Sequence, residues 1–262
     1  MPTRRRVLFC LAVTAFLSGA QNSAPAQSPP LVAAASDLQF ALEEVSHAFT
    51  SATGRSVKIS FGSSGNFARQ IRQGAPIEMF LSADEQYITD LQRDGFTQGE
   101  PALYALGRIA LFVPKGSPLH ADGNLDDLAN ALGDERLQKF AIANPQHAPY
   151  GRSAREALQR KGLWEQIGKR LVLGENVSQA AQFASSSATQ GGIIAYSLAI
   201  SPRVSALGAY ALVPEEWHAP LRQGMALTKN AGPLAREFFQ FVQSPAAKVL
   251  LAKHGFAVPE SK

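Results

Sequence analysis

Short apolar stretches alternate with helical patterns along most of this chain. Residues 31–35 form a compact apolar run typical of a buried strand, and residues 37–51 repeat apolar side chains at three- and four-residue intervals, like one face of a helix. Val57, Ile59 and Phe61 then alternate with polar residues, which predicts a half-buried strand. The repeated order of strand, glycine- and serine-rich turn and helix predicts an α/β protein with a mainly parallel sheet.

The later elements are predicted in the same way. Further strands are expected at residues 79–82, 107–113, 140–143, 192–195, 210–213 and 224–228. Further helices are expected at residues 66–73, 84–94, 125–132, 152–161, 164–170, 176–184, 233–243 and 246–254. The last two helices are amphipathic, and we expect them to pack back on the N-terminal part of the chain.

The first 26 residues predict a secretory signal peptide. Three arginines at positions 4–6 precede the apolar residues 7–17, and the Ala-Pro-Ala sequence at 24–26 fits a cleavage site before Gln27, with Ala20 as a second possible cut. The apolar run is too short to span a bilayer, which argues against a membrane transporter or channel. We therefore expect a periplasmic protein.

Removal of this signal changes the charge of the protein. The full chain has 25 basic and 21 acidic residues, and three arginines leave with the signal, so the net charge falls from +4 to +1. A nearly neutral protein lacks the basic face that nucleic-acid binding requires. Cys10, the only cysteine, also lies in the signal, so we expect no disulfide, thiolate metal site or cysteine nucleophile.

The length of the mature chain suits two lobes better than one simple α/β core. No linker rich in proline, glycine or serine interrupts its middle, so we expect strands to join the lobes, at residues 107–113 and again at 221–228. The predicted division is a signal peptide at 1–26, the first lobe at 27–108, the second lobe at 109–225 and a return to the first lobe at 226–262.

The sequence carries no enzyme motif. None of its five histidines is spaced as in a metal motif, and neither a G-x-S-x-G elbow nor a P-loop is present, so we expect no catalytic residue and no cofactor. His147 lies between Pro145 and Pro149 and is interpreted as a surface or packing residue. An exported serine hydrolase with a triad assembled from distant residues stays an alternative, which loss of ester turnover in Ser36→Ala would favour.

Four predicted strand-to-helix junctions are rich in small polar residues. They are Ala-Ser-Asp at 35–37, Gly-Ser-Ser-Gly at 62–65, Pro-Tyr-Gly at 149–151 and Glu-Asn-Val-Ser at 175–178. Each fits an N-cap by itself, but the first N–H groups of a helix lack intrahelical partners and attract anions. Because the carboxyl ends of parallel strands face one crevice, we expect these junctions to form a site for a small oxyanion, held by neutral N–H and O–H donors.

Seven sequence blocks occur in a fixed order. They are LVAAAS at 31–36, FGSSG at 61–65, ARQI at 68–71, GAP at 74–76, FLSAD at 80–84, PQHAPYG at 145–151 and ENVSQ at 175–179. In order and spacing they resemble the periplasmic molybdate-binding proteins of molybdate ABC importers, from Leu31 to Val258. The resemblance implies a two-lobed periplasmic binding protein of type II-like fold, in which each lobe is a mainly parallel sheet flanked by helices and the ligand lies in the interlobe cleft.

The resemblance also implies the residues that hold the anion. The first-lobe positions fall on Ser36 and Ser64, each with its hydroxyl and backbone N–H, and the second-lobe positions fall on Tyr150 and Val177. Val177 would act through its N–H alone. These groups would contact the oxygens of molybdate and not a bare cation.

Three further residues are expected at or near this site. One branch of the family adds a tyrosine hydroxyl at a strand end where this chain has Ala195, so Tyr150 is expected to supply that hydroxyl, and Tyr196 is a second candidate. Asp37 would repel a dianion, so we expect it to offer its N–H and turn its carboxylate away, or only to favour the helix dipole. Ser63 could replace or accompany Ser64.

The predicted function is capture of molybdate, and also of tungstate, followed by delivery to an inner-membrane ABC permease with its ATPase. The protein is expected to act as a monomer. Two alternatives remain besides the hydrolase: a binding protein for another tetrahedral oxyanion such as sulfate or thiosulfate, and a binding module that senses its ligand without transport.

Overall fold

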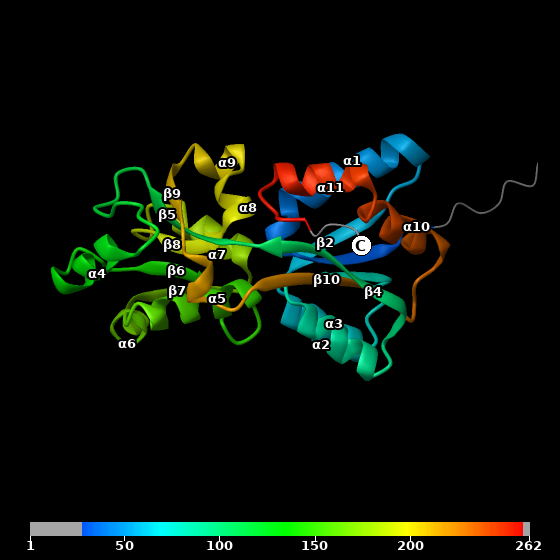
Figure 1. The fold of residues 1–262 in the computed structure, drawn as a ribbon, viewed down its shortest axis with the longest axis horizontal. Helices are drawn as coiled ribbons and strands as arrows, with labels where there is room; N and C mark the ends of the chain where they lie inside the picture. Colours follow the sequence, from blue (N-terminus) through cyan, green and yellow to red (C-terminus); the bar gives the residue numbers. More distant parts are fainter. Residues whose placement is uncertain (1–27, 259–262) are drawn as a thin grey trace, which may run out of the picture.

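The computed structural model describes residues 28–258, which fold into two five-stranded sheets flanked by helices (Figure 1). The predicted signal peptide, residues 1–26, lies outside this range. Each sheet is the centre of one lobe, and the two lobes lie end to end along the long axis of the molecule. This confirms the predicted two-lobed α/β fold. Within residues 28–258, no helix is both long enough and apolar enough to cross a membrane.

The first lobe is built on a sheet with the strand order β2-β1-β3-β10-β4, in which only β10 runs opposite to the other strands. Its strands are β1 (Leu31–Ala35), β2 (Lys58–Gly62), β3 (Met79–Ser82), β4 (Thr97–Gly107) and β10 (Leu221–Thr228). Its helices are η1 (Ser36–Leu38), α1 (Gln39–Thr53), α2 (Ser64–Arg72), α3 (Glu85–Arg93), α10 (Pro233–Val242) and α11 (Pro245–Lys253).

The second lobe repeats this plan with the strand order β7-β6-β8-β5-β9, in which only β5 runs opposite to the others. Its strands are β5 (Ile109–Pro114), β6 (Phe140–Ala143), β7 (Leu171–Gly174), β8 (Gly192–Ala195) and β9 (Gly208–Leu212). Its helices are α4 (Asp126–Gly133), α5 (Pro149–Arg160), α6 (Trp164–Ile167), η2 (Gly168–Arg170), α7 (Val177–Ala184), α8 (Tyr196–Ala199), α9 (Pro202–Ser205) and η3 (Glu215–Trp217).

The chain crosses between the lobes twice. Arg108 alone separates the end of β4 from the start of β5, and residues 213–220 lead from β9 back to β10. All of β10 pairs within the first sheet, from Leu221 onward. The exact lobe boundaries, placed after residues 108 and 225 in the sequence analysis, stay a prediction.

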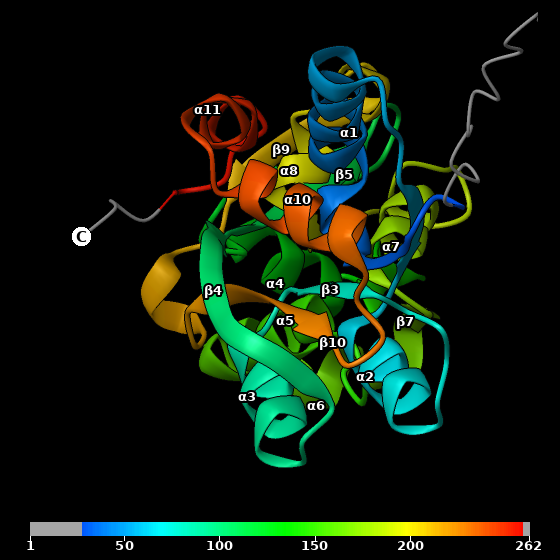
Figure 2. The same ribbon diagram turned by 90° about the vertical axis from the view of Figure 1, so that its right-hand side faces the viewer.

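Aromatic side chains fill the core of the first lobe on both faces of its sheet. Helices α1, α10 and α11 cover one face, and α2 and α3 cover the other (Figure 2). The ring of Phe49 meets Phe238 and Phe241 edge-on, with centroids 5.2 and 5.4 Å apart, and Phe67 meets Phe80 at 6.3 Å on the opposite face. Helices α10 and α11 share this core with α1.

Strand β4 was not predicted from the pattern of apolar residues. The expected strand at 107–113 contains only the last residue of β4. It is interrupted at Arg108, after which β5 begins. Gly99 has a φ of 67°, and the pairing of β4 with β10 shifts register twice, so the alternation of buried and exposed residues that marks a regular strand is lost.

Candidate functional site

A small cavity lies between the two lobes, where β1 and β2 end and where α5 and α7 begin. Its volume is about 10 Å³, room for about one water-sized sphere, so little free space is left between the lobes there. The lining residues are Ala35, Ser36, Asp37, Gly62, Ser63, Ser64, Ala83, Ala148, Pro149, Tyr150 and Val177. All four predicted junctions therefore contribute to one cavity, as do six of the seven predicted site residues.

Two serine hydroxyls of the first lobe retain a proton that they can donate. The backbone N–H of Ser178 donates to Ser36 Oγ at 3.2 Å, and the N–H of Ala83 donates to Ser64 Oγ at 3.0 Å. In both contacts the hydroxyl oxygen is the acceptor, so its own hydrogen stays available. Both serines are buried and line the cavity, which makes them candidate donors to an anion.

Backbone N–H groups add donors from both lobes. Ser64 is the first residue of α2, Val177 is the first residue of α7, and Tyr150 is the second residue of α5 after Pro149. N–H groups in the first helical turn have no intrahelical acceptor, and they carry the positive end of the helix dipole. At α7 the Asn176 side chain caps the N–H of Gln179 at 3.0 Å, which leaves the N–H of Val177 for the cavity.

The hydroxyl of Tyr150 lies in a buried cluster with Asp37 and Gln223, beside Gly107 at the end of β4. It donates to Asp37 Oδ2 at 2.9 Å and accepts from Gln223 Nε2 at 3.0 Å. A β-carbon built on Gly107 would lie 2.3 Å from this hydroxyl, so the tyrosine reaches the strand at the lobe crossing. Because the single hydroxyl proton is directed to Asp37, the group that Tyr150 offers to the cavity in this structure is its backbone N–H.

Asp37 is the only carboxyl group among the lining residues, and its side chain is turned toward the same cluster. Gln223 Nε2 donates to Asp37 Oδ2 at 2.6 Å, while Oδ1 is buried and without a hydrogen-bond partner. Burial raises the pKa of Asp37 to about 6, against the opposing effect of the hydrogen bonds from Gln223 and Tyr150. The pKa values of Tyr150 and Tyr104 are also raised. Burial is the larger cause, and the negative charge of Asp37 is the second.

The two remaining candidates lie in different surroundings. Ser63 lines the cavity, and its hydroxyl lies 3.0 Å from His147 Nδ1, so it has a partner in the second lobe. Tyr196 starts helix α8 and stacks edge-on against Tyr210 at 5.9 Å; it does not line this cavity.

The interlobe contacts of His147 and the buried amide of Gln223 were not predicted from the sequence. His147 touches the first lobe across the cavity margin instead of facing solvent, and its side chain is only 16% exposed. Gln223 is fully buried in β10, and an amide directly before the apolar residues 224–227 was a signal that could have been used. The acidic, histidine and cysteine side chains of residues 28–258 do not gather in groups of three or more that could hold a metal ion.

Comparisons with known proteins find relatives over most of the chain. The sequence model of the family described as bacterial extracellular solute-binding protein matches residues 30–257. The molybdate-binding protein ModA of Rhodobacter capsulatus is 33% identical over 88% of this chain and 90% of its own length, and that of Azotobacter vinelandii is 31% identical over 87% and 89%. The solved periplasmic molybdate-binding protein of Azotobacter vinelandii superposes with a TM-score of 0.78 at 29% identity, over 88% of this chain and all of that one.

Proposed function

The chain belongs to the bacterial extracellular solute-binding protein family, and from this premise we propose that it captures molybdate between its two lobes for an ABC importer. The relatives named above are molybdate-binding proteins, and they match this chain over most of its length. The observation that carries the proposal is the convergence of two serine hydroxyls and several first-turn N–H groups on one small cavity without a basic side chain in its lining.

Neutral donors are sufficient for a dianion in such a cavity. A hydrogen bond to a charged group contributes about 1.5–3 kcal/mol, so five to seven of them at about 2 kcal/mol each supply roughly 10–14 kcal/mol. Loss of translational freedom and ordering of the site cost roughly 4 kcal/mol or more, which leaves a dissociation constant in the micromolar range or below. We propose Ser36 and Ser64 as hydroxyl and N–H donors and Tyr150 and Val177 as N–H donors, with the N–H of Asp37 as a further candidate.

The site draws its donors from both lobes, so the lobes must separate for the anion to enter. The two crossings, at Arg108 and at residues 213–220, are the places where the chain can flex. We propose that the closed, loaded protein docks on an inner-membrane permease, whose ATPase drives transport, and that the protein acts there as a monomer in the periplasm. Amino-terminal sequencing of protein from a periplasmic extract, with Gln27 as the expected first residue, tests the exported location.

Calorimetric titration of the purified mature protein tests the ligand. Molybdate and tungstate are tetrahedral dianions of nearly equal size, and we expect both to bind with similar affinity, because rigid donors separate them poorly. Sulfate is smaller and would leave the hydrogen bonds too long, so it should bind much more weakly. Tight sulfate or thiosulfate binding without heat from molybdate would replace this proposal with the alternative oxyanion.

The geometry at Ser36, the serine that this alternative names, does not support a hydrolase. Ser36 contacts a backbone N–H and no histidine, so it lacks the general base that a serine nucleophile needs. Turnover of a generic ester by the pure protein, lost in Ser36→Ala, would be required to revive it. A sensing module without transport is distinguished by genome position, since a transport protein is expected beside genes for a permease and an ATPase.

A further inference from the structure

The loop that precedes α5 touches the first turn of α2 beside the anion cavity. The N–H of Gly65 donates to the backbone carbonyl of His147 at 2.9 Å, and His147 Nδ1 lies 3.0 Å from Ser63 Oγ. Gly65 and Ser63 belong to the first lobe, and His147 belongs to the second. These contacts therefore form only when the lobes close.

Gly65 has no room for a side chain in this arrangement. A β-carbon built on it would lie 2.7 Å from His147 O, closer than such atoms approach one another, and only 3.0 Å from His147 Cα. Its third neighbour, at 2.9 Å, is the hydroxyl end of Tyr87, which can move aside. The φ of Gly65 is not positive, so the close approach of the second lobe, and not the backbone conformation, explains the glycine.

A second tie lies next to the first. Asn66 Nδ2 donates to Glu175 Oε1 across the lobes, and the other carboxylate oxygen of Glu175 lies 3.6 Å from His147 Nε2. Arg69 Nη2 donates to Asn66 Oδ1 at 2.7 Å and fixes the orientation of that amide. His147 thus contacts the first lobe through both its backbone and its ring.

We propose that Ser63, Gly65, Asn66, His147 and Glu175 form a latch that holds the lobes closed and so sets how long the captured anion is retained. The inference rests on the proposed function, because it concerns retention of the same ligand. These are positioning residues: the anion enters the open protein before the latch exists, so the latch should affect release far more than entry.

Gly65→Ala tests the latch because it adds one methyl group at the contact and removes no donor from the cavity. Alanine is a better helix former than glycine, so the open first lobe is expected to fold normally. Gly133→Ala is the matched control, since Gly133 lies in helix α4 and a β-carbon added to it would meet no neighbouring atom within 4 Å. His147→Ala, which removes the ring contact with Ser63, is the second variant.

Two measurements on the mature protein separate the possible outcomes. Stopped-flow fluorescence with sodium molybdate should show release at least about tenfold faster in Gly65→Ala and also faster in His147→Ala, with entry nearly unchanged and Gly133→Ala like wild type. The second measurement is the interlobe distance without ligand, from probes on Glu43→Cys and Gln159→Cys, two exposed positions in different lobes. Gly65→Ala should shift this distance toward the open form.

Wild-type release rates and an unchanged interlobe distance in Gly65→Ala would overturn the latch, and so would an equal effect of Gly133→Ala. If wild type fails to bind molybdate at all, the proposed function falls, and the ligand-free distances still decide whether the latch holds the lobes together.

Discussion

Asp37 is a buried acid whose ionisation opposes folding. Its pKa rises to about 6 in the folded protein through burial, from 3.8 when exposed, so between these values the folded state binds more protons than the unfolded state. The stability contributed by this group is therefore fully present below about pH 4 and is lost as the pH rises to about 6. The difference between these two pKa values corresponds to about 3 kcal/mol.

We predict that Asp37→Asn removes this pH dependence. Urea unfolding of the ligand-free protein at pH 4 and at pH 7 should show the variant gaining about 2 kcal/mol relative to wild type over that interval. Glu43→Gln, which neutralises an exposed acid on α1, serves as the control and should give no such gain. A difference between wild type and Asp37→Asn that stays constant with pH would contradict a raised pKa.

Ser64 carries the clearest test of the binding site. Ser64→Ala removes the donor hydroxyl and leaves an oxygen of the bound anion without a partner, which should weaken molybdate binding by about 1–3 kcal/mol in calorimetry. Ser201→Ala is a matched control, because Ser201 is also buried and donates to Leu198 O at 2.7 Å, outside the cavity. Equal losses in the two variants would show that the anion binds elsewhere.

Individual site residues could be predicted where local sequence determines their position. Ser36, Ser64 and Val177 stand at strand-to-helix junctions, so the pattern alone placed them near the carboxyl ends of strands. The bond between Tyr150 and Asp37 joins residues 113 positions apart, and no local pattern predicts such a contact. The hydroxyl of Tyr150 was therefore assigned to the anion in the sequence analysis, whereas the structure directs it to Asp37.

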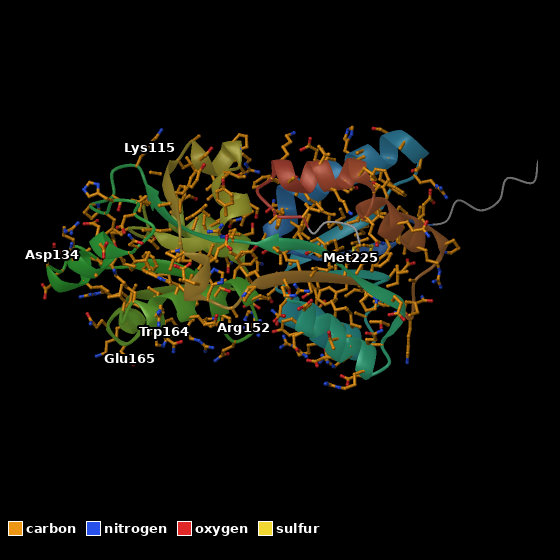
Figure 3. All side chains as sticks on the ribbon, in the orientation of Figure 1. Lys115, Asp134, Arg152, Trp164, Glu165 and Met225 are labelled. Carbon is orange, nitrogen blue, oxygen red and sulfur yellow. The ribbon has the colours of Figure 1, made fainter. Side chains whose placement is uncertain are left out.

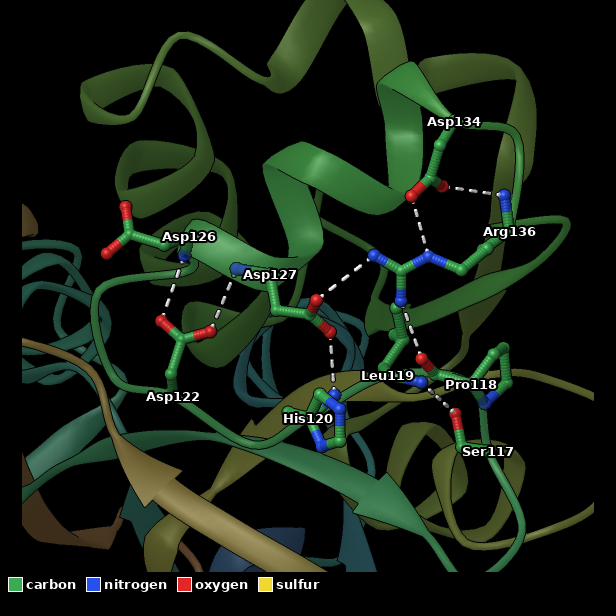
Figure 4. A network of polar contacts seen from close by, with 9 residues as sticks. All are labelled: Ser117, Pro118, Leu119, His120, Asp122, Asp126, Asp127, Asp134 and Arg136. Atoms are coloured by element: carbon green, nitrogen blue, oxygen red, sulfur yellow. Dashed lines mark hydrogen bonds and ion pairs between the residues drawn. The ribbon is translucent and has the colours of Figure 1, made fainter.

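Helix α4 is held by a polar network at the far end of the second lobe (Figure 4). The carboxylate of Asp122 accepts from the N–H groups of Asp126 and Asp127 at 2.9 and 3.0 Å. Arg136 bridges Asp127 and Asp134, at 3.1 and 2.7 Å, and also donates to Pro118 O at 2.6 Å. The network caps the helix and ties the two loops that flank it.

We predict that Asp122→Ala lowers the unfolding free energy by about 1–2 kcal/mol, because it exposes two first-turn N–H groups that lose their acceptor. Denaturant unfolding measures the loss, and molybdate affinity should not change, since the network lies in the loops around α4 and shares no residue with the cavity. The control is Glu165→Ala, an exposed acid on α6 of the same lobe (Figure 3). A loss of affinity in Asp122→Ala would contradict the view that this network is purely structural.

Whole elements were predicted best where the hydrophobic period is regular. The stripe of α1 and the alternating residues of β2 correspond to the observed helix and strand. Residues 164–170 were predicted as one helix but divide into α6 and the 3-10 turn η2 at Gly168. Helix α5 begins at Pro149, three residues earlier than expected, because proline suits the first helical position. The first turn of α5 is buried and lines the cavity.

Polar contacts join the two lobes around the cavity, beside an apolar contact in which Ala35 and Ala83 of the first lobe meet the core of the second. Arg152 of α5 pairs with Asp84 at the start of α3, and in Figure 3 it lies where the lobes adjoin. Ser178 Oγ donates to Gln39 Oε1 at 2.8 Å, and Ser197 Oγ donates to Asp37 O at 2.8 Å. Such contacts can break and re-form without unfolding either lobe, which suits a protein that opens and closes.

Sequence could predict that there are two lobes, but not how they close. Length, the alternation of strands and helices and the lack of a linker were enough for the first conclusion. Closure depends on pairs such as Gly65 and His147, which lie in different lobes and carry no common motif. The glycine was interpreted as part of a turn, and only its distance from the opposite backbone explains why it has no side chain.

Because the anion would contact both lobes at once, its binding should stabilise the whole molecule as one unit. At about 100 times the dissociation constant, a ligand that binds only the folded state adds about 2.7 kcal/mol, which should raise the melting temperature by roughly 5–10 °C for a protein of this size. We predict this rise in differential scanning calorimetry with molybdate, and a single transition in place of any separate melting of the lobes. Sodium sulfate at the same concentration is the control for ionic strength and should produce little change. Ser64→Ala should lose part of the rise at the same molybdate concentration. An equal rise with sulfate, or stabilisation of one lobe only, would show that the anion does not bridge the two lobes.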